Sequence, residues 1–182
     1  MLKLIKVLLV LILIGWIISL NTQPNQKLER VEIESGGELA HVTYVIDGDT
    51  IKVELDGEVE TVRYIGIDTP EPYREGEPEC FSKEATSANT ELVQGKIVRL
   101  VKDKEDRDRY GRLLRYVYVD EVFVNEVLVR DGFAEVMNIK PNTAHSAEFK
   151  KLENIARAGE IGVWGACSKG DNKNSQDKAV RQ

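Results

Sequence analysis

Three strand-like runs follow one another between residues 41 and 67, and a tight-turn signal joins the last two. In the run 50–55, apolar and charged side chains alternate, which is typical of a strand with one buried face. The pair Asp56-Gly57 is a strong signal for a two-residue hairpin. We therefore expect strands at 41–46, 50–55 and 59–67, with the last two forming a hairpin.

Two further strands and three helices are expected after this hairpin. Runs rich in β-branched residues predict strands at 97–101 and 113–119. Helices are predicted at 82–94, 124–131 and from about 142 to 158, capped by Ser82 and by Asn142 or Thr143. The order favours an α+β fold, a five-stranded OB-fold barrel with about three packed helices, although a generic α+β sandwich fits the periodicities nearly as well.

The N-terminal end of the chain has a different character. Lys3 and Lys6 precede an apolar run at 7–20, so residues 1–20 are expected to be an uncleaved membrane anchor or a cleaved signal peptide. The lysines favour a cytoplasmic N-terminus and an extracytoplasmic domain, secreted or tethered to the outer face of the membrane. The expected organisation is an anchor or signal at 1–20, a linker at 21–38, a folded domain at 39–167 and a disordered polar tail at 168–182.

Cys80 and Cys167 are the two cysteines of the chain. An even number of cysteines in an oxidising compartment favours a disulfide, and free buried thiols are the alternative. Because the chain has histidines at positions 41 and 145 alone, a cysteine metal site is a poor interpretation. We expect a disulfide that closes a loop of almost the whole domain.

Three short clusters, at 46–50, 63–71 and 108–112, carry the residues that suggest a chemistry. Hydrolysis of a phosphodiester requires neutralisation of the charge on the phosphate and a base that activates water. Two carboxylates for a hard cation, two arginines and one further carboxylate can supply these functions. The candidates are Asp49 and Asp68, Arg63 and Arg112, and Glu71.

The acidic clusters, taken alone, also have ordinary structural interpretations. Asp49 either ligates a hard cation, with Asp47 nearby, or belongs to a simple Asp-Gly turn. Pro70 ends the strand, so that Asp68 and Glu71 lie in a rigid loop where Glu71 can act as a general base on water. The alternative is that these acids cap a helix or remain solvated.

Arg63 and Arg112 are the candidate phosphate ligands. Arg63 shares its predicted strand face with Val59, Ile65 and Ile67, and an arginine on an apolar face requires a partner. That partner is either a structural carboxylate or a phosphate bound in a bidentate manner. Arg112 would supply a second guanidinium from the start of the last predicted strand.

Taken together, these segments resemble the thermonuclease family, the staphylococcal nuclease-like domain, over about residues 42 to 164. Further matching segments lie at 125–132, 140–142 and 162–164. The resemblance implies the five-stranded OB-fold barrel and a calcium-dependent nuclease that acts on DNA and RNA and leaves 3′-phosphate ends. In this chain it implies Asp49, Asp68 and the Thr69 carbonyl as Ca²⁺ ligands, Arg63 and Arg112 as phosphate ligands, Glu71 as the base, and Arg109 and Tyr110 as contacts to a neighbouring phosphate.

Two segments depart from the family pattern. Residues 137–139 read Met-Asn-Ile, where the type member has tyrosines that stack on a base, so base affinity should differ. The loop at 72–80 is acidic where that member is basic, and the net charge of the chain is −6. The acidic loop and the negative net charge should both weaken the electrostatic attraction of a polynucleotide. We therefore expect a local basic site on an otherwise acidic protein.

The expected function is an extracytoplasmic, calcium-dependent nuclease that acts as a monomer on DNA and RNA. A nucleic-acid-binding OB-fold module without catalysis is the main alternative, and a metal phosphoesterase for small diesters is another. Contact with a membrane through residues 1–20 is expected if that segment is retained.

Overall fold

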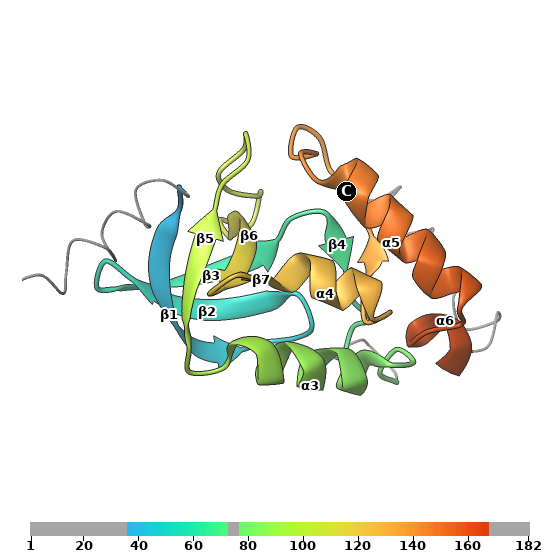
Figure 1. Cartoon of the computed structure of the whole chain (residues 1–182). Helices are drawn as coiled ribbons and strands as arrows, with labels where there is room; N and C mark the ends of the chain where they lie inside the picture. The colour runs from blue at the N-terminus through green and yellow to red at the C-terminus, as the bar shows by residue number, and fades with distance from the viewer. Residues whose placement is uncertain (1–35, 73–76, 168–182) are drawn as a thin grey trace, which may run out of the picture. The chain divides into compact units, whose positions relative to one another are not determined.

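Five strands form a closed barrel in the computed structural model, which describes residues 36–72 and 77–167 (Figure 1). Neighbouring strands pair in the order β3-β2-β1-β5-β6, and a parallel pairing of β3 with β6 closes the barrel. The five strands are β1 (Glu38–Val45), β2 (Thr50–Leu55), β3 (Glu58–Tyr64), β5 (Ile97–Val101) and β6 (Leu113–Val119). The predicted α+β fold with a five-stranded OB-fold barrel is confirmed.

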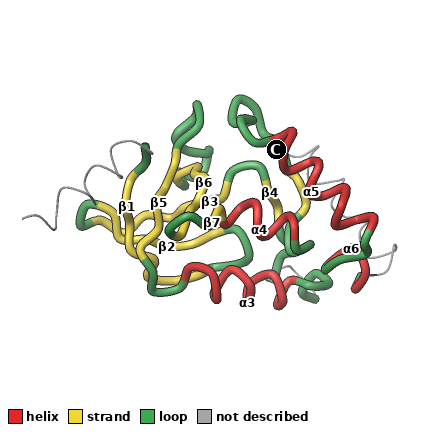
Figure 2. The backbone as a smooth tube through the Cα atoms, viewed as in Figure 1, coloured by secondary structure: helices red, strands yellow, loops and turns green. Residues whose placement is uncertain are grey.

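Helices and shorter strands surround the barrel, and Figure 2 shows the helices (red) to the right of and below the strands (yellow). The helices α3, α4 and α5 correspond to the three predicted helices, whereas the short helix α6 was not predicted. Their bounds are Ser82–Val93, Val124–Arg130, Ser146–Ala158 and Val163–Ala166. Three two-residue strands complete the fold: β4 (Ile67–Asp68) pairs with β8 (Glu135–Val136), and β7 (Val122–Phe123) pairs with β6.

The turn between β2 and β3 is the hairpin that the sequence predicts. Asp56 and Gly57 both have positive φ angles, 52° and 84°, as the two-residue hairpin favoured by Asp-Gly requires. The register of the hairpin pairs Thr50 with Arg63. The start of β2 therefore lies beside the end of β3, where two of the charged clusters begin.

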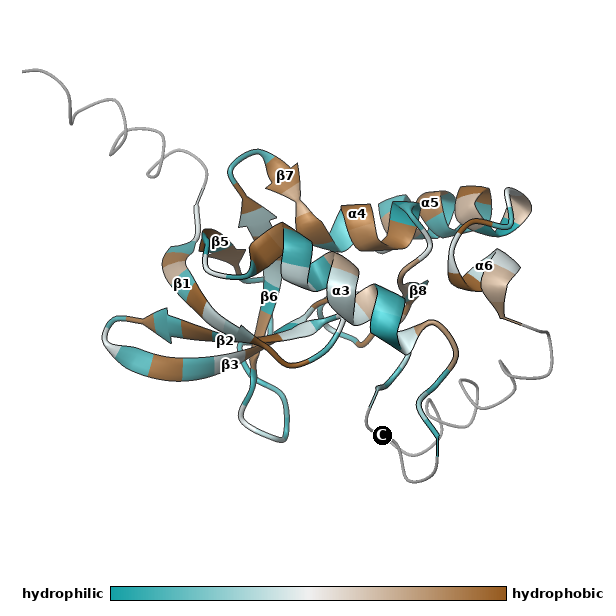
Figure 3. Cartoon of the chain, turned by 90° about the horizontal axis from the view of Figure 1, so that it is seen from below, coloured by the Kyte–Doolittle hydropathy of each residue, from teal (hydrophilic) through white to brown (hydrophobic). Residues whose placement is uncertain are grey.

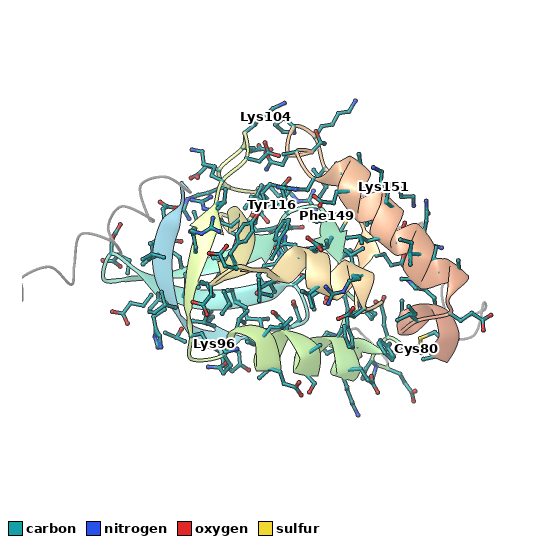
Figure 4. All side chains as sticks on the ribbon, in the orientation of Figure 1. Cys80, Lys96, Lys104, Tyr116, Phe149 and Lys151 are labelled. Atoms are coloured by element: carbon teal, nitrogen blue, oxygen red, sulfur yellow. A yellow bond between two sulfur atoms is a disulfide. The ribbon has the colours of Figure 1, made fainter. Side chains whose placement is uncertain are left out.

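Apolar side chains from the strands and from one side of the helices form a single core. On α5, Phe149 and Ala156 are fully buried and Leu152 packs against the core, which confirms the predicted apolar stripe of this helix. Figure 4 shows Phe149 near Tyr116 of β6, and the centroids of their rings are 6.4 Å apart. Hydrophobic (brown) and hydrophilic (teal) residues both occur along α3 and α4 in Figure 3, as expected for helices with one buried side.

The third strand ends earlier than predicted. β3 stops at Tyr64 rather than at Ile67, because Gly66 has a φ of 81° that ends the extended conformation. A Cβ atom at Gly66 would lie 3.0 Å from the ring of Phe149, so this turn also requires the absence of a side chain. Beyond the turn, the chain continues as β4.

The predicted apolar strand face around Arg63 is wrong. Val62 and Tyr64 are the buried residues at this end of β3, whereas Val59 is 67% exposed. Successive side chains of a strand point to opposite faces, so Arg63 projects away from the barrel interior. The prediction failed because the turn at Gly66 resets the alternation of the residues that follow.

The predicted helix caps are also wrong. Ser82 is the first residue of α3, and Phe81 precedes it with a left-handed φ of 69° and no side-chain cap hydrogen bond. Neither Asn142 nor Thr143 caps α5, which begins after His145. The side chain of Asn142 binds another loop, as described below.

The predicted anchor at 1–20, most of the linker and the tail at 168–182 lie outside the described residues. Within residues 36–72 and 77–167, none of the helices has the length and the apolar character needed to span a membrane. β1 begins at Glu38, so the last residue of the predicted linker already belongs to the barrel.

Cys80 and Cys167 form a disulfide between the start of α3 and the end of α6. The two residues are 87 positions apart in the sequence. Figure 4 labels Cys80 next to α6. Such a long closed loop removes much conformational freedom from the unfolded chain.

We expect loss of this disulfide to lower the free energy of unfolding by up to about 4–5 kcal/mol, the chain-entropy value for a loop of this length. Denaturant titrations of the protein with and without a reductant measure the difference. A variant with Cys80→Ser and Cys167→Ser is the control, since reductant should leave its midpoint unchanged. Identical midpoints for the oxidised and reduced wild-type protein would contradict this prediction.

Candidate active site

The strand register explains why three clusters far apart in the sequence meet at one end of the barrel. Arg63 in β3 pairs with Thr50 of β2 on one side and with Leu114 of β6 on the other. Asp49 immediately precedes Thr50, and Arg112 lies two residues before Leu114. The central position of β3 in this part of the barrel therefore places Arg63 between the other two clusters.

Asp49 is buried and makes four polar contacts. Its Oδ2 atom accepts hydrogen bonds from the main-chain N–H and the hydroxyl of Thr69, at 2.7 and 3.0 Å. Its Oδ1 atom accepts a hydrogen bond from the hydroxyl of Thr50 at 3.0 Å and lies 3.2 Å from Nη1 of Arg63. Since a carboxylate offers about four lone-pair positions, these contacts use the full accepting capacity of Asp49.

Arg63 connects the two carboxylates that were predicted to share a cation. Its Nη2 atom donates to Oδ1 of Asp68 at 2.9 Å, and Nη1 donates to the carbonyl groups of Tyr64 and Ile67 at 2.9 and 2.8 Å. The side chain of Arg63 is 12% exposed. Burial alone would lower the pKa of Arg63, but the charges of Asp49 and Asp68 outweigh it and raise the pKa, so the guanidinium stays protonated.

The turn at 46–50 is closely packed against the Thr69 loop. A Cβ atom on Gly48 would lie 2.6 Å from the hydroxyl of Thr69, so only glycine allows Thr69 to reach Asp49. Asp47 lies beside them and accepts a hydrogen bond from the N–H of Asp49 at 3.0 Å. Burial and, second to it, the nearby charge of Asp49 raise the pKa of Asp47 to about 7.

Arg112 is oriented by a turn that is organised around Asp108. The carboxylate of Asp108 accepts hydrogen bonds from Nε of Arg112 at 2.7 Å and from the main-chain N–H groups of Tyr110 and Arg112 at 2.9 and 3.0 Å. Arg109 donates to the hydroxyl of Tyr110 at 2.6 Å, and the Tyr110 side chain is largely exposed. Arg109 and Tyr110 thus present a cation and a hydroxyl at the surface beside Arg112.

Arg63 and Arg112 line the same pocket, which has a volume of about 250 Å³. Asp108, Arg109 and Tyr110 contribute to its polar side. The apolar side includes Met137 and Ile139, the residues that replace tyrosines of the family type member, together with Ile65, Ile67 and Leu114. Both arginines therefore border one cavity, whose volume is sufficient for a phosphate and part of a nucleotide.

The proposed cation ligands and base, Asp49, Asp68, Thr69 and Glu71, are not among the residues that line this pocket. In the part of the chain that the structure describes, no three or more His, Cys, Asp or Glu side chains form a group arranged to hold a metal. The predicted set of cation ligands contains only two carboxylates, those of Asp49 and Asp68. The main-chain carbonyl of Thr69 is its third member. These oxygen donors fit a hard cation such as Ca²⁺, provided that one of the present contacts of Asp49 is replaced.

Buried asparagines connect the site loops, and the sequence reasoning did not predict this role. On α3, Asn89 donates to the carbonyl of Asp47 at 2.9 Å and accepts a hydrogen bond from the hydroxyl of Tyr64 at 2.9 Å. Asn142 accepts hydrogen bonds from the N–H groups of Lys104 and Glu105, at 2.9 and 2.8 Å. These contacts join segments about 40 residues apart, namely 42 for Asn89–Asp47 and 38 for Lys104–Asn142.

A buried glutamate stabilises the segment that carries Asp68. Asp68 in β4 pairs with Glu135 of β8, and the N–H of Val136 in β8 donates to Glu153 of α5 at 3.1 Å. Burial would raise the pKa of Glu153, but hydrogen bonds from Lys150 and Val136 lower it. Glu153 is therefore ionised in the folded protein, and an acidic residue at a core-facing helix position is the sequence signal that could have identified it.

Comparison with known proteins gives a consistent result. The profile of the family described as Staphylococcal nuclease homologue matches residues 61–166, which is more than half of the chain. The chain is 44% identical over 132 residues to the SPbeta prophage-derived endonuclease YokF of Bacillus subtilis (strain 168), a match that covers 70% of the chain and 45% of YokF. It therefore spans less than half the length of that relative.

Two further relatives are matched over more of their length. Endonuclease YncB of Bacillus subtilis (strain 168) is 39% identical over 147 residues, covering 78% of this chain and 70% of YncB. Thermonuclease of Staphylococcus hyicus is 36% identical over 124 residues, covering 68% of this chain and 73% of that protein. The profile match, these identities and the barrel agree, and the chain belongs to the staphylococcal nuclease family of phosphodiester-hydrolysing enzymes.

Proposed function

We propose that this chain is a calcium-dependent nuclease that hydrolyses phosphodiester bonds of DNA and RNA and leaves 3′-phosphate ends. The observation that carries the proposal is the shared pocket of Arg63 and Arg112, together with the contacts of Asp49 and Asp68 to the Arg63 guanidinium. Guanidinium groups bind phosphate in a bidentate manner, and carboxylates bind hard cations. Membership of a nuclease family supports the same conclusion.

The two arginines and Glu71 have different roles in the proposed reaction. Arg63 and Arg112 donate hydrogen bonds to the phosphate oxygens and stabilise the charge that develops in the transition state. Glu71 accepts a proton from the water that attacks phosphorus. The bond from the water oxygen to phosphorus forms as the bond from phosphorus to the 5′-oxygen breaks, and the 5′-oxygen leaves as an alkoxide that takes up a proton from solvent water. The phosphate then remains on the 3′-oxygen.

Asp49, Asp68 and the carbonyl of Thr69 are the proposed calcium ligands. When bound, the ion supplies positive charge beside the phosphate and lowers the energy of the anionic transition state. The contact of Asp49 with Arg63, at 3.2 Å, is the longest of the four that Asp49 makes. A cation bound by Asp49 would replace this contact, whereas the hydrogen bonds from Nη1 of Arg63 to the carbonyl groups of Tyr64 and Ile67 can remain.

The pocket walls suggest how the substrate is recognised. Arg109 and Tyr110 lie at its exposed polar side and are proposed to contact the phosphate next to the scissile one. Met137 and Ile139 offer apolar contact but no aromatic ring for stacking, which is worth about 1–3 kcal/mol per base. We therefore propose weak base preference, with affinity that comes mainly from the phosphates.

We also propose an extracytoplasmic location. The disulfide between Cys80 and Cys167 supports it, because structural disulfides persist mainly in oxidising compartments. The lysines and apolar run of residues 1–20 support export, with a tether to the outer face of the membrane if that segment is retained. We also propose that the protein acts as a monomer.

Cleavage of labelled DNA and RNA oligonucleotides with calcium or with a calcium chelator tests the proposed activity. We expect cleavage of both substrates in calcium, loss of cleavage in chelator, and products whose 3′ ends carry a phosphate by mass spectrometry. Binding of the oligonucleotides without cleavage would instead support a binding module. Cleavage of a small chromogenic diester but not of the oligonucleotides would support a phosphoesterase for small diesters.

A further inference from the structure

Glu79 forms two hydrogen bonds with the main chain of Glu71, the proposed base. The N–H of Glu71 donates to Oε2 of Glu79 at 2.8 Å, and the N–H of Glu79 donates to the carbonyl of Glu71 at 3.0 Å. The two residues are eight positions apart. This reciprocal pair fixes the main chain of Glu71 directly, whatever the conformation of the residues between them.

The main chain of Glu79 is itself fixed to the start of α3. Its carbonyl accepts a hydrogen bond from the N–H of Ser82 at 3.1 Å, in the turn that begins the helix. Cys80, the next residue, forms the disulfide with Cys167, and Phe81 stacks on Phe133 with 5.7 Å between the ring centroids. Glu79 thus connects Glu71 to a rigid part of the molecule.

The same helix also contacts the other half of the site. Asn89, fully buried on α3, donates to the carbonyl of Asp47 in the turn that leads to Asp49. Helix α3 therefore contacts the cation-binding turn through Asn89 and the loop of Glu71 through Ser82 and Glu79. A common support of this kind keeps the proposed base and the proposed cation ligands in a constant relative position.

We propose that Glu79 is a positioning residue, whose carboxylate fixes the main chain of Glu71 and so directs the Glu71 side chain towards the attacking water. This inference rests on the proposed role of Glu71 as the base. Hydrogen bonds to an ionised acceptor are among the stronger ones in proteins. Small errors in the placement of a catalytic group can cost about a hundredfold in rate.

The alternative is that Glu79 acts only through its negative charge, as the acidic character of the 72–80 loop suggests. Removing such a charge should strengthen the attraction of a polynucleotide and lower KM at low salt. The positioning role instead predicts a fall in kcat with KM little changed, because the main chain of Glu71 does not bind the substrate. The two interpretations therefore predict changes in different kinetic constants.

Three variants of Glu79 separate accepting capacity from charge. Glu79→Ala removes the acceptor and should lower kcat by about ten- to a hundredfold. Glu79→Gln keeps an acceptor oxygen at the same reach without the charge and should retain kcat within about threefold. Glu79→Asp keeps the charge but shortens the side chain and should behave like Glu79→Ala. Glu77→Ala and Glu77→Gln, at an exposed acid of the same loop, are matched controls whose kcat should stay unchanged.

A double variant shows whether the effect passes through Glu71. In a Glu71→Gln background, Glu79→Ala should cause almost no further loss, because there is no base left to position. Thermal unfolding verifies that each variant is folded. If Glu79→Ala does not fold, the kcat values of Glu79→Gln and Glu79→Asp are compared instead. Equal kcat values for those two variants, or a full further loss in the double variant, would overturn the positioning role.

The same experiment distinguishes failure of this inference from failure of the proposed function. Wild-type activity of Glu71→Gln would contradict the role of Glu71 as the base, and the inference would fall with it. An inactive Glu71→Gln combined with full kcat in Glu79→Ala would overturn the inference alone.

Discussion

Replacing Arg63 with alanine is expected to lower the cleavage rate at saturating substrate about a thousandfold or more. Removal of a single preorganised donor to a developing oxyanion costs about 10²–10³ in rate, and arginines that stabilise phosphoryl transfer contribute about 10³–10⁵. Arg63 also contacts both Asp49 and Asp68, so its loss disturbs the proposed cation site as well. Initial rates on a labelled oligonucleotide in calcium measure the effect.

Stability has to be measured together with the rate of this variant. Breaking a buried ion pair by removing one partner costs about 3–5 kcal/mol. Arg63→Ala would leave Asp49 and Asp68 without the guanidinium group that both of them contact. Arg63→Lys is the matched control, since it keeps the charge but loses the planar fork. It should lose less unfolding free energy than Arg63→Ala, because the charge beside Asp49 and Asp68 remains, and it should be intermediate in rate. A folded Arg63→Ala protein with near wild-type activity would refute the assigned role.

Replacing Glu71 with glutamine is expected to lower kcat by about 10²–10⁴, the usual contribution of a general base. Glu71 lies in the loop after Pro70 and outside the core, so the free energy of unfolding should change by less than about 1 kcal/mol. The measurement is kcat on the oligonucleotide, together with a denaturant titration. Glu71→Asp is the control, since it retains a carboxylate and should keep more activity than Glu71→Gln.

A kcat for Glu71→Gln within a fewfold of wild type would show that another group activates the water. A large fall in unfolding free energy without a fall in kcat would instead show that Glu71 serves the fold. Either result would also remove the basis of the positioning role proposed for Glu79.

Local patterns in the sequence were sufficient to predict the strands and the hairpin of the barrel. Alternation over 50–55 and the Asp56-Gly57 pair depend on neighbouring residues alone, and the structure has both. The end of β3 could not be predicted in the same way, because the close packing of Gly66 against the ring of Phe149 exists only in the folded chain. That ring comes from a helix more than 80 positions later in the chain (149 − 66 = 83).

The candidate residues of the site could be predicted, but the contacts that orient them could not. Arg63, Asp49 and Asp68 have charges that point to phosphate and cation chemistry, and the structure places them in contact. Asn89 and Asn142 carry no such signal, since asparagine occurs mostly in exposed turns. Their role follows from hydrogen bonds across distant segments, which are visible only once the chain is folded.

The central claim is that Arg63 in β3 and Arg112 just before β6, which are far apart in the sequence, act on one phosphate in one pocket. A double-mutant cycle with Arg63→Lys, Arg112→Lys and the combined variant measures this directly, with cleavage rates on one oligonucleotide in calcium as the readout. Because two groups that share a ligand are energetically coupled, we predict a combined loss that differs from the product of the single losses by at least about threefold. A combined loss equal to that product, with all variants folded, would contradict a common site.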